Sequence, residues 1–230
     1  MRARLFVALL FLLTPDVVNA GGREAGATSV TIQRFVPNEL ATEDFVYQVT
    51  QAMSEFKARN GDEMDEAFVG VIPGNPTLIE QIFVWKTLSS ELPDVIEPFL
   101  MFSDSGRMNI TATGVLDASK YSLDESLYAP TTETVIQALR PDFNQDELEK
   151  AFSFLSVSIR GTEGGYGSAM GLGSDGNSTV RLVVDGWATR EAAAQWVSTQ
   201  NDTTKAMFEK FKENGVGDLR QAFKPVVEVD

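Results

Sequence analysis

The chain has 230 residues, of which 43% are hydrophobic, and its 19 Lys and Arg against 33 Asp and Glu give a formal net charge of −14 at pH 7. This acidic balance argues against binding to nucleic acid or to an anionic membrane surface, because both need a basic face on the protein. The absence of cysteine and histidine excludes thiolate and imidazole catalysis, iron–sulfur clusters and histidine-ligated metals, so an enzyme built from this chain must use carboxylates, Tyr, Lys, Arg, amides or an organic cofactor.

Residues 1–20 are expected to be a secretory signal peptide. Arg2 and Arg4 form a basic start, residues 5–13 are an unbroken apolar run, and residues 18–20 fit a small-residue cleavage site. A membrane-spanning helix needs about 20 apolar residues, and no later stretch approaches that length. We therefore expect a secreted or lumenal protein, with a short retained anchor as the alternative.

The rest of the chain is expected to be built twice, as repeat one over 21–116, a linker over 117–132 and repeat two over 133–230. Each repeat has the predicted order strand, helix, strand, strand, helix, strand. The two copies align at an offset of about 102 to 104 positions. The offset places Ile32-Gln33 on Ile136-Gln137, Pro37 on Pro141, and Trp85 on Trp187.

In the first copy, β-branched alternation and turn residues mark the strands, and capping residues mark the helices. The acidic run over 62–66 matches no calcium loop, and no metal site is predicted. In chain order, we expect a strand over 29–36, a helix capped by Thr42 that ends at Asn60-Gly61, a hairpin of 67–72 and 77–85, a short or kinked helix from Ser90, and a strand over 108–116.

The second copy repeats this plan with clearer caps. Asn144 to Glu147 resembles a capping box, and Thr189 is the expected cap of a later helix that breaks near Asn201. The predicted strands cover 134–139, 165–173, 179–185 and 219–229. The buried stripe of the first helix is expected to be Leu148, Ala151, Phe152, Leu155 and Ile159.

This element order is the split βαβ pattern of a ferredoxin-like α+β fold, in which two helices cover one face of a four-stranded sheet. The other face must also be covered. Two copies in one chain can put those faces together, so the sequence predicts a single-chain pseudo-dimeric α/β barrel. The expected assembly is a monomer or a weak homodimer.

Three sequons are candidate glycosylation sites if the source is eukaryotic, at Asn109, Asn177 and Asn201. Asn177 is the strongest of them, because it lies in a predicted hairpin turn. The glycines over 171–176 formally match a dinucleotide fingerprint, but a strand follows them instead of a helix, which favours the same turn.

Trp85 and Trp187 each end the third strand of their copy. A large aromatic next to an amide or acid is typical of a small-molecule pocket, and the alternative is that each Trp simply packs between strand and helix. Strand alternation puts Gln81 and Phe83 on the face of Trp85, and Val183 and Asp185 on the face of Trp187. Further candidates for proton transfer or anion stabilisation, among which spacing does not choose, are Tyr47, Tyr121, Tyr128, Tyr166, Arg34, Arg140, Arg160 and Arg181.

The chain resembles the antibiotic-biosynthesis-monooxygenase-like (ABM) domains of the dimeric α/β-barrel superfamily. The resemblance rests on the element order and on two segments, Ile82-Phe83-Val84-Trp85-Lys86-Thr87-Leu88-Ser89 and Val184-Asp185-Gly186-Trp187-Ala188-Thr189-Arg190-Glu191. Cofactor-free oxygenases of that family pair this Trp with an Asn four residues before it. Here those positions hold Gln81 and Val183, so the resemblance implies one site, in the first copy. Haem-binding relatives use a histidine or an equivalent axial ligand, and this chain has no histidine.

The resemblance implies a protein that acts on a small hydrophobic, aromatic or polyketide-like metabolite without a cofactor, as an oxygenase, cyclase or isomerase. Gln81 would polarise the substrate and Trp85 would stack on it, while Phe83, Asp185 and Trp187 would line ligand pockets. The first alternative is a non-catalytic secreted glycoprotein that binds a hydrophobic ligand. The second is a structural duplication whose site has decayed.

Overall fold

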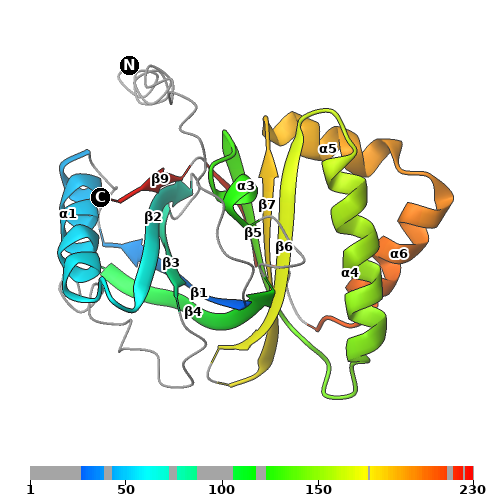
Figure 1. Ribbon diagram of the computed structural model, residues 1–230, viewed down its shortest axis with the longest axis horizontal. Helices are drawn as coiled ribbons and strands as arrows, with labels where there is room; N and C mark the ends of the chain where they lie inside the picture. Colours follow the sequence, from blue (N-terminus) through cyan, green and yellow to red (C-terminus); the bar gives the residue numbers. More distant parts are fainter. Residues whose placement is uncertain are drawn as a thin grey trace.

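The computed structural model describes residues 27–38, 43–72, 77–86, 106–117, 123–175, 177–216, 220–224 and 226–229. Its strands form one nine-stranded sheet with helices packed on its outer sides, which confirms the α+β class. Figure 1 shows α1 at one side of the molecule, α4, α5 and α6 at the opposite side, and the strands between them. Within the described residues, no helix is both long enough and apolar enough to cross a membrane.

The first half follows the predicted order. Its long helix begins and ends within one residue of the expected bounds, while the helix expected from Ser90 lies outside the described residues. The elements are β1 (Ala27–Pro37), α1 (Glu43–Arg59), β2 (Met64–Ile72), β3 (Leu78–Trp85) and β4 (Gly106–Asp117).

The second half confirms the predicted caps. The Asn144 side chain accepts a hydrogen bond from the Glu147 N–H at 3.1 Å, and Thr189 caps the next helix in the same way. That helix ends near Asn201, as expected, and Asn201 itself caps the helix that follows, which the sequence interpretation did not assign. All five residues of the predicted stripe are buried. The elements are β5 (Thr131–Ala138), α4 (Gln145–Arg160), β6 (Gly165–Ser174), β7 (Thr179–Trp187), α5 (Arg190–Thr199), α6 (Asp202–Glu213), β8 (Arg220–Lys224) and β9 (Val227–Glu228).

Both halves arrange their strands in the same order. The sheet runs β8-β5-β7-β6-β4-β1-β3-β2-β9, so each half shows its fourth, first, third and second strands in sequence. β4 of the first half pairs with β6 of the second, and β9 of the second half pairs with β2 of the first. The outermost strands, β8 and β9, are two residues apart in the chain, so one C-terminal segment reaches both edges of the sheet.

Two regions differ in their elements from what the sequence predicts. The region 117–132, expected to be only a linker, contains a short helix, α3 (Leu123–Leu127), whose two leucines are buried in the core, and also the start of β5. The final strand, expected over 219–229, is divided into β8 and β9. Pro225 stands between them in the sequence, and proline has no N–H to donate to a strand ladder.

The core has three parts because both faces of the sheet are covered. A central cluster combines apolar residues of both halves, such as Val30 and Ile82 with Ile136 and Leu182. Two outer clusters lie between each half's strands and its helices. Residues 29–37 are therefore all buried, whereas a half-exposed strand would alternate.

A buried ionic cluster also joins the halves. Arg34 Nε donates to Glu80 Oε2 at 2.5 Å, Lys224 forms an ion pair with the same carboxylate, and the Thr134 hydroxyl donates to Glu80 Oε2 at 2.9 Å. Burial acts to raise the pKa of Glu80, but the nearby Lys224 and Arg34 cations hold it below its ordinary value. Glu80 is therefore ionised and bound by cations from both halves.

Candidate functional site

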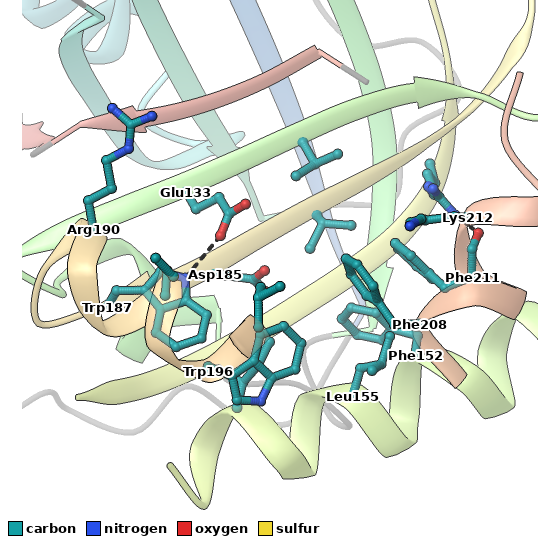
Figure 2. A pocket seen from close by; sticks show the side chains of 17 residues that line it. Glu133, Phe152, Leu155, Asp185, Trp187, Arg190, Trp196, Phe208, Phe211 and Lys212 are labelled. Carbon is teal, nitrogen blue, oxygen red and sulfur yellow. Dashed lines mark hydrogen bonds between the residues drawn. The ribbon is translucent and has the colours of Figure 1, made fainter. Parts of the chain in front are cut away.

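A pocket of about 370 Å³ lies in the second half, between β5 and β7 on one side and the helices α4, α5 and α6 on the other. Five aromatic side chains line it. Figure 2 shows Glu133, Asp185, Trp187 and Trp196 gathered at one end and the phenylalanines with Lys212 at the other. The aromatic lining residues are Phe152, Trp187, Trp196, Phe208 and Phe211.

Strand geometry places the polar groups of the pocket. Arg181, Val183, Asp185 and Trp187 alternate along β7, so their side chains point to the same face of the sheet. Glu133 on β5 is the cross-strand neighbour of Asp185. Cross-strand neighbours have Cβ atoms about 4.5–5.5 Å apart, so two carboxyl groups share this end of the pocket.

These two carboxyl groups are both nearly inaccessible to solvent. Asp185 and Glu133 are each 7% exposed. Burial and, second, the charge of Glu133 raise the pKa of Asp185 well above its ordinary value, while a hydrogen bond from Ser168 Oγ to Asp185 Oδ1 opposes that rise. The raised pKa favours the protonated form of Asp185 beside a second acid, an arrangement that suits proton transfer.

The indoles fix this acidic end. Trp187 Nε1 donates to Glu133 Oε2 at 3.0 Å, and the Trp187 and Trp196 rings lie 5.8 Å apart between centroids. Trp196 Nε1 donates to Ser158 Oγ at 3.1 Å, so the second indole is also held by a hydrogen bond. Hydrogen bonds therefore orient both indoles where the aromatic wall meets the acids.

The opposite end of the pocket carries a buried cation. The Arg181 guanidinium donates to the Phe211 carbonyl and to Gln137 Oε1, and its Cζ lies 3.6 Å from the centre of the Phe211 ring. Burial lowers the pKa of Arg181 to about 10, so the group stays charged at neutral pH.

The predicted catalytic residues lie on the equivalent face of the first half and do not line this pocket. Trp85 Nε1 donates to the Thr31 hydroxyl at 3.1 Å, and Phe83 stacks on Trp85 with centroids 6.2 Å apart. Gln81 is fully buried beside Gln33, and neither amide has a hydrogen-bond partner among the described residues. The roles predicted for Gln81 and Trp85 stay predictions.

The two predicted ligand-pocket residues of the second copy, Asp185 and Trp187, line the pocket, but Phe83 does not. Of the other candidates, only Arg181 lines it. Arg34 belongs to the ionic cluster, and Arg140 and Arg160 pair at the surface with Asp142 and Glu125. Tyr47, Tyr128 and Tyr166 are exposed, and Tyr121 lies outside the described residues.

The candidate glycosylation residues differ in setting. Asn177 is exposed in the turn between β6 and β7. Asn201 is exposed and caps α6, its Oδ1 accepting from the Thr204 N–H at 2.9 Å. Asn109 lies in β4, and its side chain is outside what the structure describes. Glycosylation stays a prediction at all three.

The sequence interpretation missed Glu133 and the far aromatic wall. From the sequence, Glu133 marks only the start of the second repeat. The 102-residue offset matches Glu133 to Thr31, and each of these two residues accepts the hydrogen bond of the tryptophan in its own half. That offset was the signal that could have found it. The wall formed by Phe152, Phe208 and Phe211 depends on how three helices pack, which helical spacing alone does not determine.

Haem does not fit this pocket. Protein ligands of haem iron are His, Cys, Met or Tyr, and none of these side chains lines it. In the described part of the chain, no group of three or more acidic residues is placed to hold a metal ion. The polar groups that line the pocket are two acids at one end, the buried Arg181 guanidinium and Lys212 at the other end, and Arg190. This set of groups suits an organic ligand.

Comparison with known proteins supports the fold. No protein-family model and no curated protein matches the chain. Among solved structures, a putative chlorite dismutase has a TM-score of 0.57 and 11% sequence identity, and the match covers 88% of this chain and 96% of that one. An anthrone oxidase-like protein has a TM-score of 0.56 and 10% sequence identity, and the match covers 89% of this chain and 92% of that one. A putative monooxygenase from Fusobacterium nucleatum has a TM-score of 0.53 and 9% sequence identity, and the match covers 90% of this chain and 94% of that one. The chain therefore shares its fold with these monooxygenase-like and chlorite dismutase-like structures.

Proposed function

We propose that this protein binds a small, largely aromatic molecule in the pocket of its second half and acts on it as a monooxygenase-like enzyme. One observation carries the proposal: a pocket of about 370 Å³ walled by five aromatic side chains encloses the buried pair Glu133 and Asp185. Its volume lies in the range of sites for small organic ligands, about 300–1,000 Å³. Structural neighbours that are putative monooxygenases and an anthrone oxidase-like protein support the reaction class.

The chemistry begins with proton removal. Asp185 holds its proton, which leaves Glu133 as the ionised acid, and Glu133 accepts a proton from an activated CH₂ group of the substrate or from the hydroxyl of its enol tautomer, which gives the same anion. The electron-rich anion that forms reacts with O₂ to give a peroxide, and the proton returns to that peroxide. Loss of water then leaves a carbonyl group, so the change is CH₂ + O₂ → C=O + H₂O, and no organic cofactor is consumed.

The aromatic walls exclude water from this step. A dry site strengthens electrostatic interactions and protects reactive anions from protonation by solvent. Trp187 also contributes to proton removal, because its Nε1–H donates to Glu133 Oε2 at 3.0 Å and stabilises the ionised form of that carboxyl group.

The test is oxygen uptake with anthrone, followed by mass spectrometry of the product. Glu133→Gln removes the base and is expected to lower the rate about a hundredfold or more. The matched control is Thr31→Val, which alters the equivalent position in the first half and is expected to keep the wild-type rate. Equal rates for wild type and Glu133→Gln would contradict the assignment. Binding of anthrone without oxygen uptake would favour the alternative, a non-catalytic binding protein.

We also propose that the two halves are a tandem duplication that closes a single-chain pseudo-dimeric α/β barrel. The same strand order in both halves, and the C-terminal segment that reaches both sheet edges, support this proposal.

We further propose that the protein is secreted after removal of residues 1–20 and carries glycans on its sequons. Terminal sequencing and mass determination of the protein from culture medium test it.

A further inference from the structure

Arg181 is a fully buried cation that lacks a counter-ion among the residues the structure describes. Its relative exposure is 0%, and its two hydrogen-bond acceptors, the Phe211 carbonyl and the Gln137 amide oxygen, are both neutral. The face of the Phe211 ring, 3.6 Å from Arg181 Cζ, attracts the cation but carries no net charge. A buried charge without a counter-ion is expensive, and proteins normally pair it or neutralise it. Its pKa of about 10 means that it is not neutralised at pH 7.

The fold itself does not require this cation. Trp85 pairs with Ser29 and Trp187 pairs with Thr131, so the strand register sets the offset at 102 residues and corrects the predicted match of Gln137 to Gln33. At this offset Arg181 and Gln137 match Ile79 and Phe35, which are also cross-strand neighbours and lie fully buried in the first half's outer core. The same position on the same kind of strand is thus filled by an apolar side chain where no such pocket is described. The charge in the second half therefore points to a ligand.

The guanidinium also keeps hydrogen-bonding capacity for a ligand. Arginine has five N–H donors, and the contacts above use one on each terminal nitrogen. The Nε atom is buried and has no partner in the described part of the chain. Nε–H next to a terminal N–H is a fork that matches the two oxygens of a carboxylate.

We infer that the pocket takes an aromatic carboxylate whose anionic group pairs with Arg181. This inference rests on the proposed function, because it names the substrate class of the same pocket. The aromatic part lies against Trp187, Trp196 and the phenylalanines, and the end remote from the carboxylate reaches the acids.

Strand spacing sets the length of such a molecule. Arg181 and Asp185 are four residues apart on β7, which is roughly 13 Å along a strand. Lys212 also lines the cation's end but already pairs with Glu209 at 2.8 Å. An elongated ring system with its acid at one end and a reactive CH₂ or hydroxyl at the other fits this polarity.

The test compares 2-naphthoate with 2-naphthamide, which have the same ring system but different charge, by isothermal titration calorimetry. Wild type is expected to bind the carboxylate roughly ten- to a hundredfold more tightly, as for a charge-assisted hydrogen bond. Arg181→Ile copies the first half's residue and is expected to lose this preference while still binding the amide. The control Arg160→Gln, at an exposed arginine, is expected to keep it.

Each outcome has one meaning. If wild type binds both probes equally, or Arg181→Ile keeps the preference, the inference is wrong while the proposed aromatic pocket stands. If wild type binds neither probe, the proposed function fails as well. The wild-type comparison decides the case even if Arg181→Ile is unstable, although removal of an unpaired buried cation is expected to leave its thermal unfolding temperature unchanged or higher.

Discussion

At the scale of single residues, two tryptophans make the same hydrogen bond to different partners. Trp85 Nε1 donates to a threonine hydroxyl at 3.1 Å, and Trp187 Nε1 donates to a glutamate carboxylate at 3.0 Å. The change from Thr31 to Glu133, together with the change from Phe83 to Asp185, places two acids where the first half has none. The chemical asymmetry between the halves thus depends on very few positions.

Asp185→Asn is expected to change how stability depends on pH. The raised pKa of Asp185 means that the folded protein keeps this proton at pH values where the unfolded chain has lost it. This contribution to stability is fully present below about pH 4 and is lost as pH rises through the folded-state pKa. Asparagine does not titrate, so the variant does not lose this stability as pH rises. The free energy of unfolding of the variant, relative to that of wild type, should therefore increase between pH 4 and 8. Urea denaturation at several pH values measures it.

A constant difference between wild type and Asp185→Asn over that range would contradict the raised pKa. The comparison of the two proteins is needed because the lowered pKa of Glu80 has the opposite effect, with stability lost as pH falls. Glu80 is unchanged in both proteins, so its contribution cancels.

Strand alternation was sufficient to predict that Asp185 and Trp187 share one face, and the structure places both in the pocket. The sequence prediction nevertheless favoured the first half, because Gln81 keeps an amide four residues before Trp85. The sequence does not show that Glu133 and Asp185 are cross-strand neighbours, because strand register depends on pairing between segments more than 40 residues apart.

At the scale of elements, the helices over the pocket depend on local caps. α5 ends and α6 begins around Asn201, whose Oδ1 accepts from the Thr204 N–H at 2.9 Å. α6 carries Phe208 and Phe211 over the pocket, so its start position sets part of the wall.

Asn201→Ala is expected to lower the free energy of unfolding by about 1 kcal/mol, because the cap is lost. Asn201→Asp is the matched control, since aspartate caps equally well and both variants remove the sequon. Urea unfolding of protein produced without glycosylation measures the difference. Equal losses for Asp and Ala would show that the cap does not stabilise α6.

Local signals predicted most of the elements and missed those set by distant contacts. The predicted caps at Asn144 and Thr189 are encoded within three residues of sequence, and both are confirmed, as is the helix break near Asn201. α3 is a five-residue helix whose burial in the central core, not its own propensity, stabilises it. The division of β8 from β9 follows from their pairing with opposite sheet edges, which local sequence does not show.

At the scale of the whole molecule, the two halves form one structural unit. They share the central apolar cluster, and the buried carboxylate of Glu80 binds Arg34 of the first half and Lys224 of the second. The shared cluster makes it unfavourable for either half to fold alone, because each would expose an apolar sheet face.

Glu80→Gln is expected to destabilise the protein by about 3–5 kcal/mol, because it removes the buried carboxylate that pairs with both Arg34 and Lys224. Chemical unfolding should remain a single transition, since both halves lose support together. Lys57, which pairs with the partly exposed Glu228, offers a control, and Lys57→Gln is expected to change stability by less than about 1 kcal/mol. A loss of similar size in both variants would contradict the role of the ionic cluster.

The most direct test of the second-half pocket uses the three tryptophans as reporters of where an aromatic ligand binds. Trp85→Phe leaves Trp187 and Trp196 at the pocket, while Trp187→Phe with Trp196→Phe leaves only Trp85 in the first half. Titration with 2-naphthoate is predicted to change the fluorescence of the first variant and leave that of the second unchanged. A change in the second variant and none in the first would contradict this account and place the site beside Gln81.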